Sequence, residues 1–347
     1  MRQPIFIMGS GLVTPFGLGI AENFGRIETG ASAIASYAND DISSSPYYAA
    51  RIADHIIDEP FAKMASGAAF TKLEKMMILA ISQSLSQVEQ EIGKRTALIV
   101  ATTKGNIDVL EDHNDFPSER AYLSTMAEVV ANHFGISTTP VVVSNACVSG
   151  VLAVAVAKKI LESERYDNAI VVAGDLVSRF TLTGFQSFQA LSDAPCTPYS
   201  LNRTGISLGE GAAATFITKQ QPKNNAIEIL SDATTNDANH ISGPSRTGEG
   251  LYQSVQKALA EGELLPSDID FISAHGTATL YNDEMEAIAF HRAQLQQVPL
   301  HSLKGVYGHT LGAAGLIETV LGMEMMVQNK ALPTVGFGVL GVSKSLH

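Results

Sequence analysis

The stretch Val141-Val-Val-Ser-Asn-Ala-Cys147-Val-Ser-Gly150, followed by the apolar run Val151–Ala157, decides the fold. The β-branched residues at 141–143 predict a strand, and the apolar run predicts a helix over 150–161 that is buried on every face. A cysteine between them would stand at a helix N-terminus, where the helix dipole and free N–H groups favour a thiolate and can stabilise an oxyanion. From this placement alone, Cys147 is either a catalytic nucleophile or a small buried apolar residue.

Strand-like and helix-like segments alternate on both sides of this stretch. The predicted strands lie at 5–8, 96–101, 141–143, 169–173, 212–217, 226–230, 269–273 and 298–302. The predicted helices lie at 68–92, 124–134, 150–161, 250–261, 283–296 and 313–327. This alternation predicts an α/β fold with a mostly parallel, buried sheet and helices on both of its faces.

A polar segment with a proline, Lys219–Asn225, is the best candidate for an internal linker. It divides the chain into two predicted halves, 1–220 and 221–347. In each half one strand leads into a Thr/Gly-rich turn and another leads into a Gly/Ala-rich helix start. The order of the elements therefore suggests a duplication.

Composition excludes several classes of protein. The 347 residues are 45% hydrophobic and 17% charged, which is typical of a globular protein. With 23 basic and 35 acidic residues the net charge is −12, which is unfavourable for binding nucleic acids or anionic membranes. Two cysteines, Cys147 and Cys196, are too few for a disulfide framework or a four-ligand zinc site. With no signal peptide or membrane-spanning run predicted, we expect a cytoplasmic protein. Gly9-Ser-Gly11 hints at dinucleotide binding, but Thr14 stands at the third glycine position.

Two histidines stand in Gly/Thr-rich turns after predicted strands. His275 lies in Ala274-His-Gly-Thr-Ala-Thr279, and His309 lies in Gly308-His-Thr-Leu-Gly312, five residues after Lys304. Functional sites of α/β proteins gather at the ends of parallel strands. Each histidine alone can also be a hydrogen-bonded structural residue, so both interpretations stay open at this point.

Together these segments resemble the β-ketoacyl–acyl carrier protein synthases, the condensing enzymes of the thiolase superfamily. The resemblance rests on Ile7–Gly17, Asn145–Gly150, Val172–Asp175, Pro198–Arg203, Gly205–Ala212, Ala274–Thr279, Asn282–Glu286 and Ser302–Gly315, which occur in the family's order. It implies a thiolase-like, five-layered α-β-α-β-α fold built from two duplicated halves. It also implies that no metal or cofactor takes part, because the substrates are carried on the phosphopantetheine of an acyl carrier protein.

The resemblance implies a Cys-His-His site of the elongating type. Cys147 would accept the acyl group, and His275 and His309 would stabilise the enolate formed from malonyl-carrier protein. Lys304 would orient or polarise His275, and Glu286 would pair with Lys304. The initiating branch uses Cys, His and Asn, so His309 argues against that branch.

Thr277 and Thr279 would hydrogen-bond the pantetheine arm, again by resemblance. Cys196 lies in mid-chain and does not fill the role of a thiolase's second cysteine. The family normally ends with two strands that carry a Gly-Phe-Gly-Gly-type turn. Gly336-Phe-Gly338 comes too early to be that turn, so we expect the second half to lack the usual terminal strands.

The predicted function is decarboxylative Claisen condensation in fatty acid or polyketide-type elongation. The alternatives are a non-catalytic partner subunit similar to a chain-length factor and a thiolase-type enzyme that uses coenzyme A thioesters. The expected partners are an acyl carrier protein and a second chain, in a homodimer or in a heterodimer with another ketosynthase-like chain. Lys63, Lys72 and Lys75 could form a carrier-docking patch or simply a solvated helix face.

Overall fold

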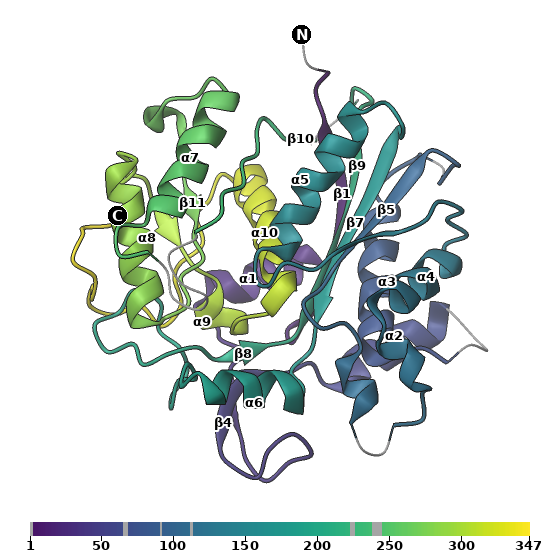
Figure 1. Ribbon diagram of the computed structural model, residues 1–347, viewed down its shortest axis with the longest axis horizontal. Helices are drawn as coiled ribbons and strands as arrows, with labels where there is room; N and C mark the ends of the chain where they lie inside the picture. Colours follow the sequence, from purple (N-terminus) through teal and green to yellow (C-terminus); the bar gives the residue numbers. More distant parts are fainter. Residues whose placement is uncertain (1–2, 65–68, 91, 112–113, 223–225, 238–244) are drawn as a thin grey trace.

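A mixed sheet of seven strands forms the centre of the larger half of the molecule (Figure 1). The computed structural model describes residues 3–64, 69–90, 92–111, 114–222, 226–237 and 245–347. Parts of two predicted segments, residues 68 and 91 of the helix and 223–225 of the linker, lie outside these ranges. Within them the sheet order is β10-β1-β9-β7-β5-β6, with β2 paired to β1.

The strands of this sheet are β1 (Phe6–Thr14), β2 (Gly17–Leu18), β5 (Thr96–Ala101), β6 (Val141–Val143), β7 (Asn168–Asp175), β9 (Gly211–Thr218) and β10 (Ile227–Glu228). β5 pairs in parallel with both β6 and β7, and for these strands the predicted parallel arrangement is confirmed. β9 runs antiparallel between β1 and β7, so the expectation of a mostly parallel sheet was wrong for this part.

Helices cover both faces of the sheet (Figure 1). The α-helices are α1 (Ile20–Glu28), α2 (Asp54–Met64), α3 (Lys72–Leu85), α4 (Leu123–His133), α5 (Ser149–Glu162), α6 (Arg179–Ser187), α7 (Glu249–Glu261), α8 (Leu280–Arg292), α9 (Lys304–Tyr307) and α10 (Ala314–Gln328). Short 3-10 turns are η1 (Ile107–Leu110), η2 (Ser118–Ala121), η3 (Pro266–Asp268) and η4 (Leu311–Ala313). One face carries α2, α3 and α4, and the opposite face carries α5 and α10.

β1 continues through Gly9 and Gly11, where the sequence predicted that the strand would end at Met8. A Cβ at Gly11 would lie 2.0 Å from the carbonyl oxygen of Ala80, and one at Gly9 would lie 2.3 Å from that of Ser84. The two glycines therefore allow α3 to lie directly against the strand. This explains the glycine pattern without any bound dinucleotide.

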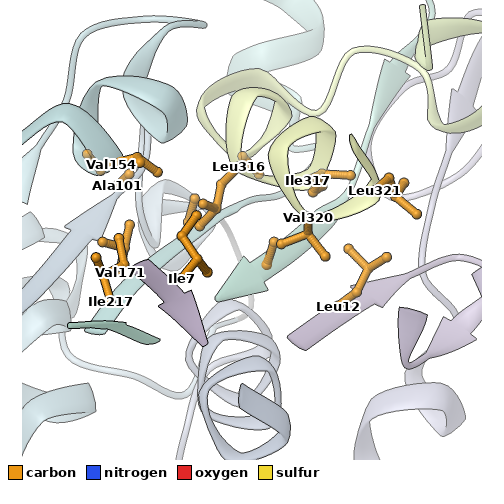
Figure 2. Close-up of a cluster of buried hydrophobic side chains, with 14 of the residues drawn as sticks. Ile7, Leu12, Ala101, Val154, Val171, Ile217, Leu316, Ile317, Val320 and Leu321 are labelled. Carbon is orange, nitrogen blue, oxygen red and sulfur yellow. The ribbon is translucent and has the colours of Figure 1, made fainter. Parts of the chain in front are cut away.

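Apolar side chains dominate the core between the sheet and the α5–α10 pair (Figure 2). Its labelled side chains come from β1, β5, β7, β9, α5 and α10: Ile7, Leu12, Ala101, Val154, Val171, Ile217, Leu316, Ile317, Val320 and Leu321. All of them are buried. This packing fixes the start of α5, and with it the residues just before that helix, relative to the sheet.

The smaller half lies on the other side of α5 and α10 (Figure 1). Its described residues contain a parallel pair of two-residue strands, β11 (Ile272–Ser273) and β12 (Leu300–His301), which α7 and α8 cover. The layers thus run α, β, α, β, α, which confirms the predicted architecture. A separate three-stranded sheet contains β3 (Ala35–Tyr37), β4 (Tyr47–Ala50) and β8 (Leu208–Gly209).

Among the described residues, no helix combines the length and the apolarity that crossing a membrane requires.

Candidate active site

Cys147 lies in a strained turn between β6 and α5. Ala146, directly before it, has a φ of 48°, a left-handed conformation that costs a non-glycine residue roughly 1 kcal/mol or more. The hydroxyl of Ser149 holds the turn, since it accepts from the backbone N–H of Asn145 (2.8 Å) and donates to the carbonyl of Ala146 (2.6 Å). The turn places Cys147 two residues before α5, as the sequence predicted.

α5 and α10 approach each other closely just beyond the cysteine. A Cβ at Gly150 would lie 2.7 Å from the backbone nitrogen of Leu316, and one at Gly315 would lie 2.7 Å from that of Val151. Only glycine at both positions permits this approach. The contact brings η4 and the residues before it next to Cys147.

His309 lies two residues before η4 and contacts the cysteine directly. Its Nε2 lies 2.9 Å from the Sγ of Cys147. The backbone N–H of Leu311 donates to Nδ1 of the same ring (3.2 Å), so Nδ1 is an acceptor. Because a neutral imidazole has one N–H and one acceptor nitrogen, the proton of His309 is on Nε2 and points toward the sulfur.

His275 completes the group from the other side of the site. Its ring packs edge-on against His309, with the ring centroids 5.1 Å apart. The sulfur of Cys147 and a ring nitrogen of each histidine all lie within 4.8 Å of one another. The structure therefore brings together three residues that the sequence placed in different halves.

Burial sets the protonation states of these three groups. It lowers the pKa of His275 to about 3, with a further contribution from the charge of Lys304, and it lowers the pKa of His309 well below the usual value. Both rings are therefore neutral at physiological pH. Burial also raises the pKa of Cys147 to about 11, so the predicted helix-stabilised thiolate is not the resting form.

Lys304 forms its ion pair with Glu318 of α10, and the predicted pairing of Lys304 with Glu286 was wrong. Glu286 instead accepts hydrogen bonds from the backbone N–H groups of His275 (2.8 Å) and Gly276 (2.6 Å) and from the hydroxyl of Tyr199 (2.9 Å). It therefore anchors the loop that carries His275. Sequence reasoning missed Glu318, although an acidic residue in the mostly apolar segment 314–328 was a signal for a buried partner.

Thr277 and Thr279 bond to each other and to the start of α8. Their hydroxyl oxygens are 3.1 Å apart, and Asn282 donates to Thr277 through its side chain (3.1 Å) and to Thr279 through its backbone N–H (3.4 Å). Asp283 supports the same loop by accepting from the N–H of Ala278 (3.1 Å). A role of the two threonines in holding pantetheine remains a prediction.

The predicted basic patch is largely neutralised. The Nζ of Lys72 lies 3.0 Å from a carboxylate oxygen of Glu210, and the Nζ of Lys75 lies 2.7 Å from one of Asp58. Two of the three lysines are therefore engaged within the chain. This supports the interpretation as a solvated, ion-paired helix face over that of a docking patch.

An open cavity of about 840 Å³ leads to the nucleophile. Cys147 and His275 both line it, and apolar side chains such as Val151, Phe271 and Met323 form much of its wall. A volume of this size accommodates an organic ligand. A thioester in this cavity can therefore reach both the sulfur of Cys147 and His275.

Comparisons with known proteins agree with this geometry. Residues 2–223 match the model of the β-ketoacyl synthase N-terminal domain, and residues 227–338 match that of the C-terminal domain. The chain is 24% identical to the 3-oxoacyl-[acyl-carrier-protein] synthase 2 of Coxiella burnetii, over 96% of this chain and 88% of that protein.

Solved structures show the same fold. A structure of the ketosynthase ApeO with its chain length factor ApeC from Xenorhabdus doucetiae matches with a TM-score of 0.82, at 23% identity, over 96% of this chain and 90% of the solved one. The AntDE:AntF complex, a type II polyketide acyl carrier protein with its ketosynthase, matches with a TM-score of 0.83, at 21% identity, over 98% and 90%. From the two domain models, this chain belongs to the β-ketoacyl synthases, a family of acyltransferases that carry out condensation in fatty acid or polyketide elongation.

Proposed function

We propose that this chain condenses an acyl thioester, held on Cys147, with malonyl-carrier protein in a decarboxylative Claisen reaction. The observation that carries the proposal is the 2.9 Å contact between Nε2 of His309 and the sulfur of Cys147, with His275 beside it. Family membership gives the class of reaction, and this contact supports the roles that we propose for Cys147, His275 and His309.

In the first half-reaction the sulfur of Cys147 attacks the carbonyl of an acyl-carrier thioester. A new C–S bond forms, the carrier's C–S bond breaks, and the departing carrier thiol takes the proton that Cys147 gives up. Because the pKa of the thiol is raised, the thiolate needs help while it forms. The Nε2–H of His309 points at the sulfur and donates to the developing negative charge.

In the second half-reaction malonyl-carrier protein loses carbon dioxide. The electron pair of the broken C–C bond becomes an enolate, whose oxygen accepts hydrogen bonds from the neutral His275 and His309. The enolate carbon then attacks the acyl group, forms the new C–C bond and expels the sulfur of Cys147 as a thiolate, which takes up a proton from solvent. The product is β-ketoacyl-carrier protein.

We propose that this chemistry needs no metal and no cofactor, since decarboxylation supplies the driving force. Cys147, His275 and His309 lie close enough together to bind one metal ion, but the hydrogen bonds of His309 argue against it. Coordination through Nε2 would move the proton of His309 to Nδ1, where it would face the N–H of Leu311. Metal-binding histidines instead donate their second N–H to an acceptor.

The expected partners are an acyl carrier protein and a second ketosynthase-like chain. Leu110, Phe180 and Phe188 are 59%, 53% and 70% exposed. Leu110 and Phe180 border a second cavity, of about 680 Å³, between η1 and α6. Large apolar side chains that are exposed beside a cavity, as Leu110 and Phe180 are, are typical of interaction surfaces. We infer that another copy, or a related chain as in the ApeO–ApeC complex, covers this face.

The first test is intact-mass measurement after incubation with acyl-carrier protein. The wild-type chain should gain one acyl group, and Cys147→Ala should gain none. Cys196→Ser is the matched control, because Cys196 is 2% exposed and its sulfur donates to a backbone carbonyl, so it should retain the adduct. No adduct on a folded wild-type chain would contradict the proposal and favour the non-catalytic, chain-length-factor-like alternative.

A further inference from the structure

A buried carboxylate, Asp175, ends β7 beside the active site. Its Oδ1 accepts from the hydroxyls of Thr102 (2.8 Å) and Thr103 (2.9 Å) and from the N–H of Lys104 (3.3 Å). Its Oδ2 accepts from the N–H groups of Thr103 (2.9 Å) and Gly312 (2.8 Å). Asp175 thus joins the loop after β5 to the 3-10 turn η4.

η4 is the turn that sets the orientation of His309. Leu311, its first residue, has a φ of 51° and donates its N–H to Nδ1 of His309. Gly312, the next residue, donates its N–H to Asp175. A left-handed leucine persists only where its surroundings hold it. The carboxylate of Asp175 therefore holds η4 through the N–H of Gly312. The N–H of Leu311 in the same turn occupies Nδ1 of His309 and so leaves the proton on Nε2, facing Cys147.

The charge of Asp175 does not activate the nucleophile. It acts with burial to raise the pKa of Cys147, whereas a group selected to promote the thiolate would be cationic. Hydrogen-bond geometry is therefore the contribution that benefits the reaction. We propose that Asp175 is a positioning residue, which holds η4 and thereby keeps His309 as a hydrogen-bond donor to the sulfur of Cys147. This inference rests on the proposed function.

Two substitutions separate geometry from charge. In Asp175→Asn the amide oxygen can occupy the Oδ2 position and keep the bonds from Thr103 and Gly312. Its NH2 group would then face the hydroxyls of Thr102 and Thr103, which can turn to accept, and the longer bond from the N–H of Lys104 (3.3 Å) would be lost. Asp175→Ala removes both the charge and the bonds. Thr218→Val is the matched control, since it removes a buried hydroxyl bond (2.7 Å) to Asn168 at the opposite end of β7.

The readouts are kcat and KM of condensation and the pH profile of Cys147 alkylation by iodoacetamide. Asp175→Asn should keep kcat within about threefold of wild type and move the alkylation profile to lower pH. Asp175→Ala should lower kcat about 100-fold at a similar KM, because a displaced catalytic group loses rate steeply. Its alkylation profile should move less than that of Asp175→Asn, because the thiolate also loses the donor His309. Thr218→Val should lower the melting temperature without changing either readout.

Three results would overturn the proposal. One is an Asp175→Ala variant that keeps the wild-type kcat and shows only a lower melting temperature, as we expect for Thr218→Val. Another is a folded Asp175→Asn variant that loses as much activity as Asp175→Ala. The third is an alkylation profile that moves as far in Asp175→Ala as in Asp175→Asn.

A further variant covers the case in which Asp175→Ala does not fold. Thr103→Val removes one hydroxyl bond isosterically and should lower kcat by about threefold, and an unchanged kcat would contradict the proposal. If the wild-type chain forms no acyl adduct, the proposed function fails. The alkylation profiles would still test the link from Asp175 to the Cys147–His309 contact.

Discussion

The two halves of the molecule hold their catalytic groups by different means. In the larger half, β5, β7 and β9 are buried along their whole lengths, and apolar packing against α5 fixes Cys147. In the smaller half, His275 and His309 stand on loops near two strands of two residues each. Buried carboxylates hold these loops: Glu286 accepts from the backbone of His275, and Asp175 accepts from that of Gly312. Close packing thus places the nucleophile, and hydrogen bonds to anions place the histidines.

The largest effect should come from removing the groups of the smaller half. His275→Ala or His309→Ala should each lower the rate of condensation about 100- to 1000-fold, the usual loss for one donor to a developing oxyanion. Acylation of Cys147, which belongs to the larger half, should persist in His275→Ala and should slow in His309→Ala, because His309 also donates to the forming thiolate. Single-turnover assays with mass detection separate the two steps. Equal loss of both steps in His275→Ala would show that the halves do not divide the reaction in this way.

The next largest effect should come from disturbing a close backbone contact between β1 and α3 in the larger half. In Gly11→Ala the new methyl group would lie 2.0 Å from the carbonyl oxygen of Ala80, so the strand or α3 must move. We expect about 3 kcal/mol less stability in urea unfolding, at the upper end of overpacking effects. Gly25→Ala is the control, because nothing lies within 4 Å of its new Cβ. A tolerated Gly11→Ala would mean that this half is less tightly packed than described.

The protonation state of the nucleophile gives a smaller, graded effect. With a pKa of about 11, the thiolate fraction of Cys147 should rise about tenfold per pH unit between pH 7 and 10. Alkylation by iodoacetamide, followed by peptide mass mapping, measures this rise. Cys196, which is buried, should stay unmodified. A plateau below pH 9 would show that the thiol is more acidic than its burial implies.

The smallest expected effect is a change in stability that tests how loosely the side of α10 facing the open cavity is packed. Gly322 lies inside α10 next to the open cavity, and a Cβ there would meet only the ring of Phe271 at 3.7 Å, an ordinary contact. Gly322→Ala should therefore raise stability by about 0.5–1 kcal/mol through helix propensity. A loss in urea unfolding would show that this side is packed as tightly as the side at Gly11.

Local patterns were enough to predict the elements around the nucleophile. The β-branched run at 141–143 and the apolar run after Cys147 correspond to β6 and α5, and the predicted helix at 313–327 corresponds to α10. Two features were not predictable in this way. β9 lies antiparallel in the sheet because of pairing with β1, which no local pattern records.

The partners of the buried charges were also missed. The resemblance assigned Glu286 to Lys304, but an ion pair depends on which helix passes within reach, and here that helix is α10 with Glu318. Asp175 appeared in the sequence only within Val172–Asp175, one of the segments that carry the family resemblance. Its role depends on Gly312, which is 137 positions away. Long-range hydrogen bonds of this kind are visible only in three dimensions.

The contact between Cys147 and His309 joins residues that are 162 positions apart, and this has a consequence for synthesis of the chain. At typical translation rates Cys147 leaves the ribosome about 8–30 s before His309 does. During that interval its thiol has an ordinary cysteine pKa of about 9, so at neutral pH it carries roughly 100 times more thiolate than in the finished site. The nascent protein is thus most sensitive to oxidants and electrophiles before its second half arrives. Completion of the chain protects the nucleophile as well as making it useful.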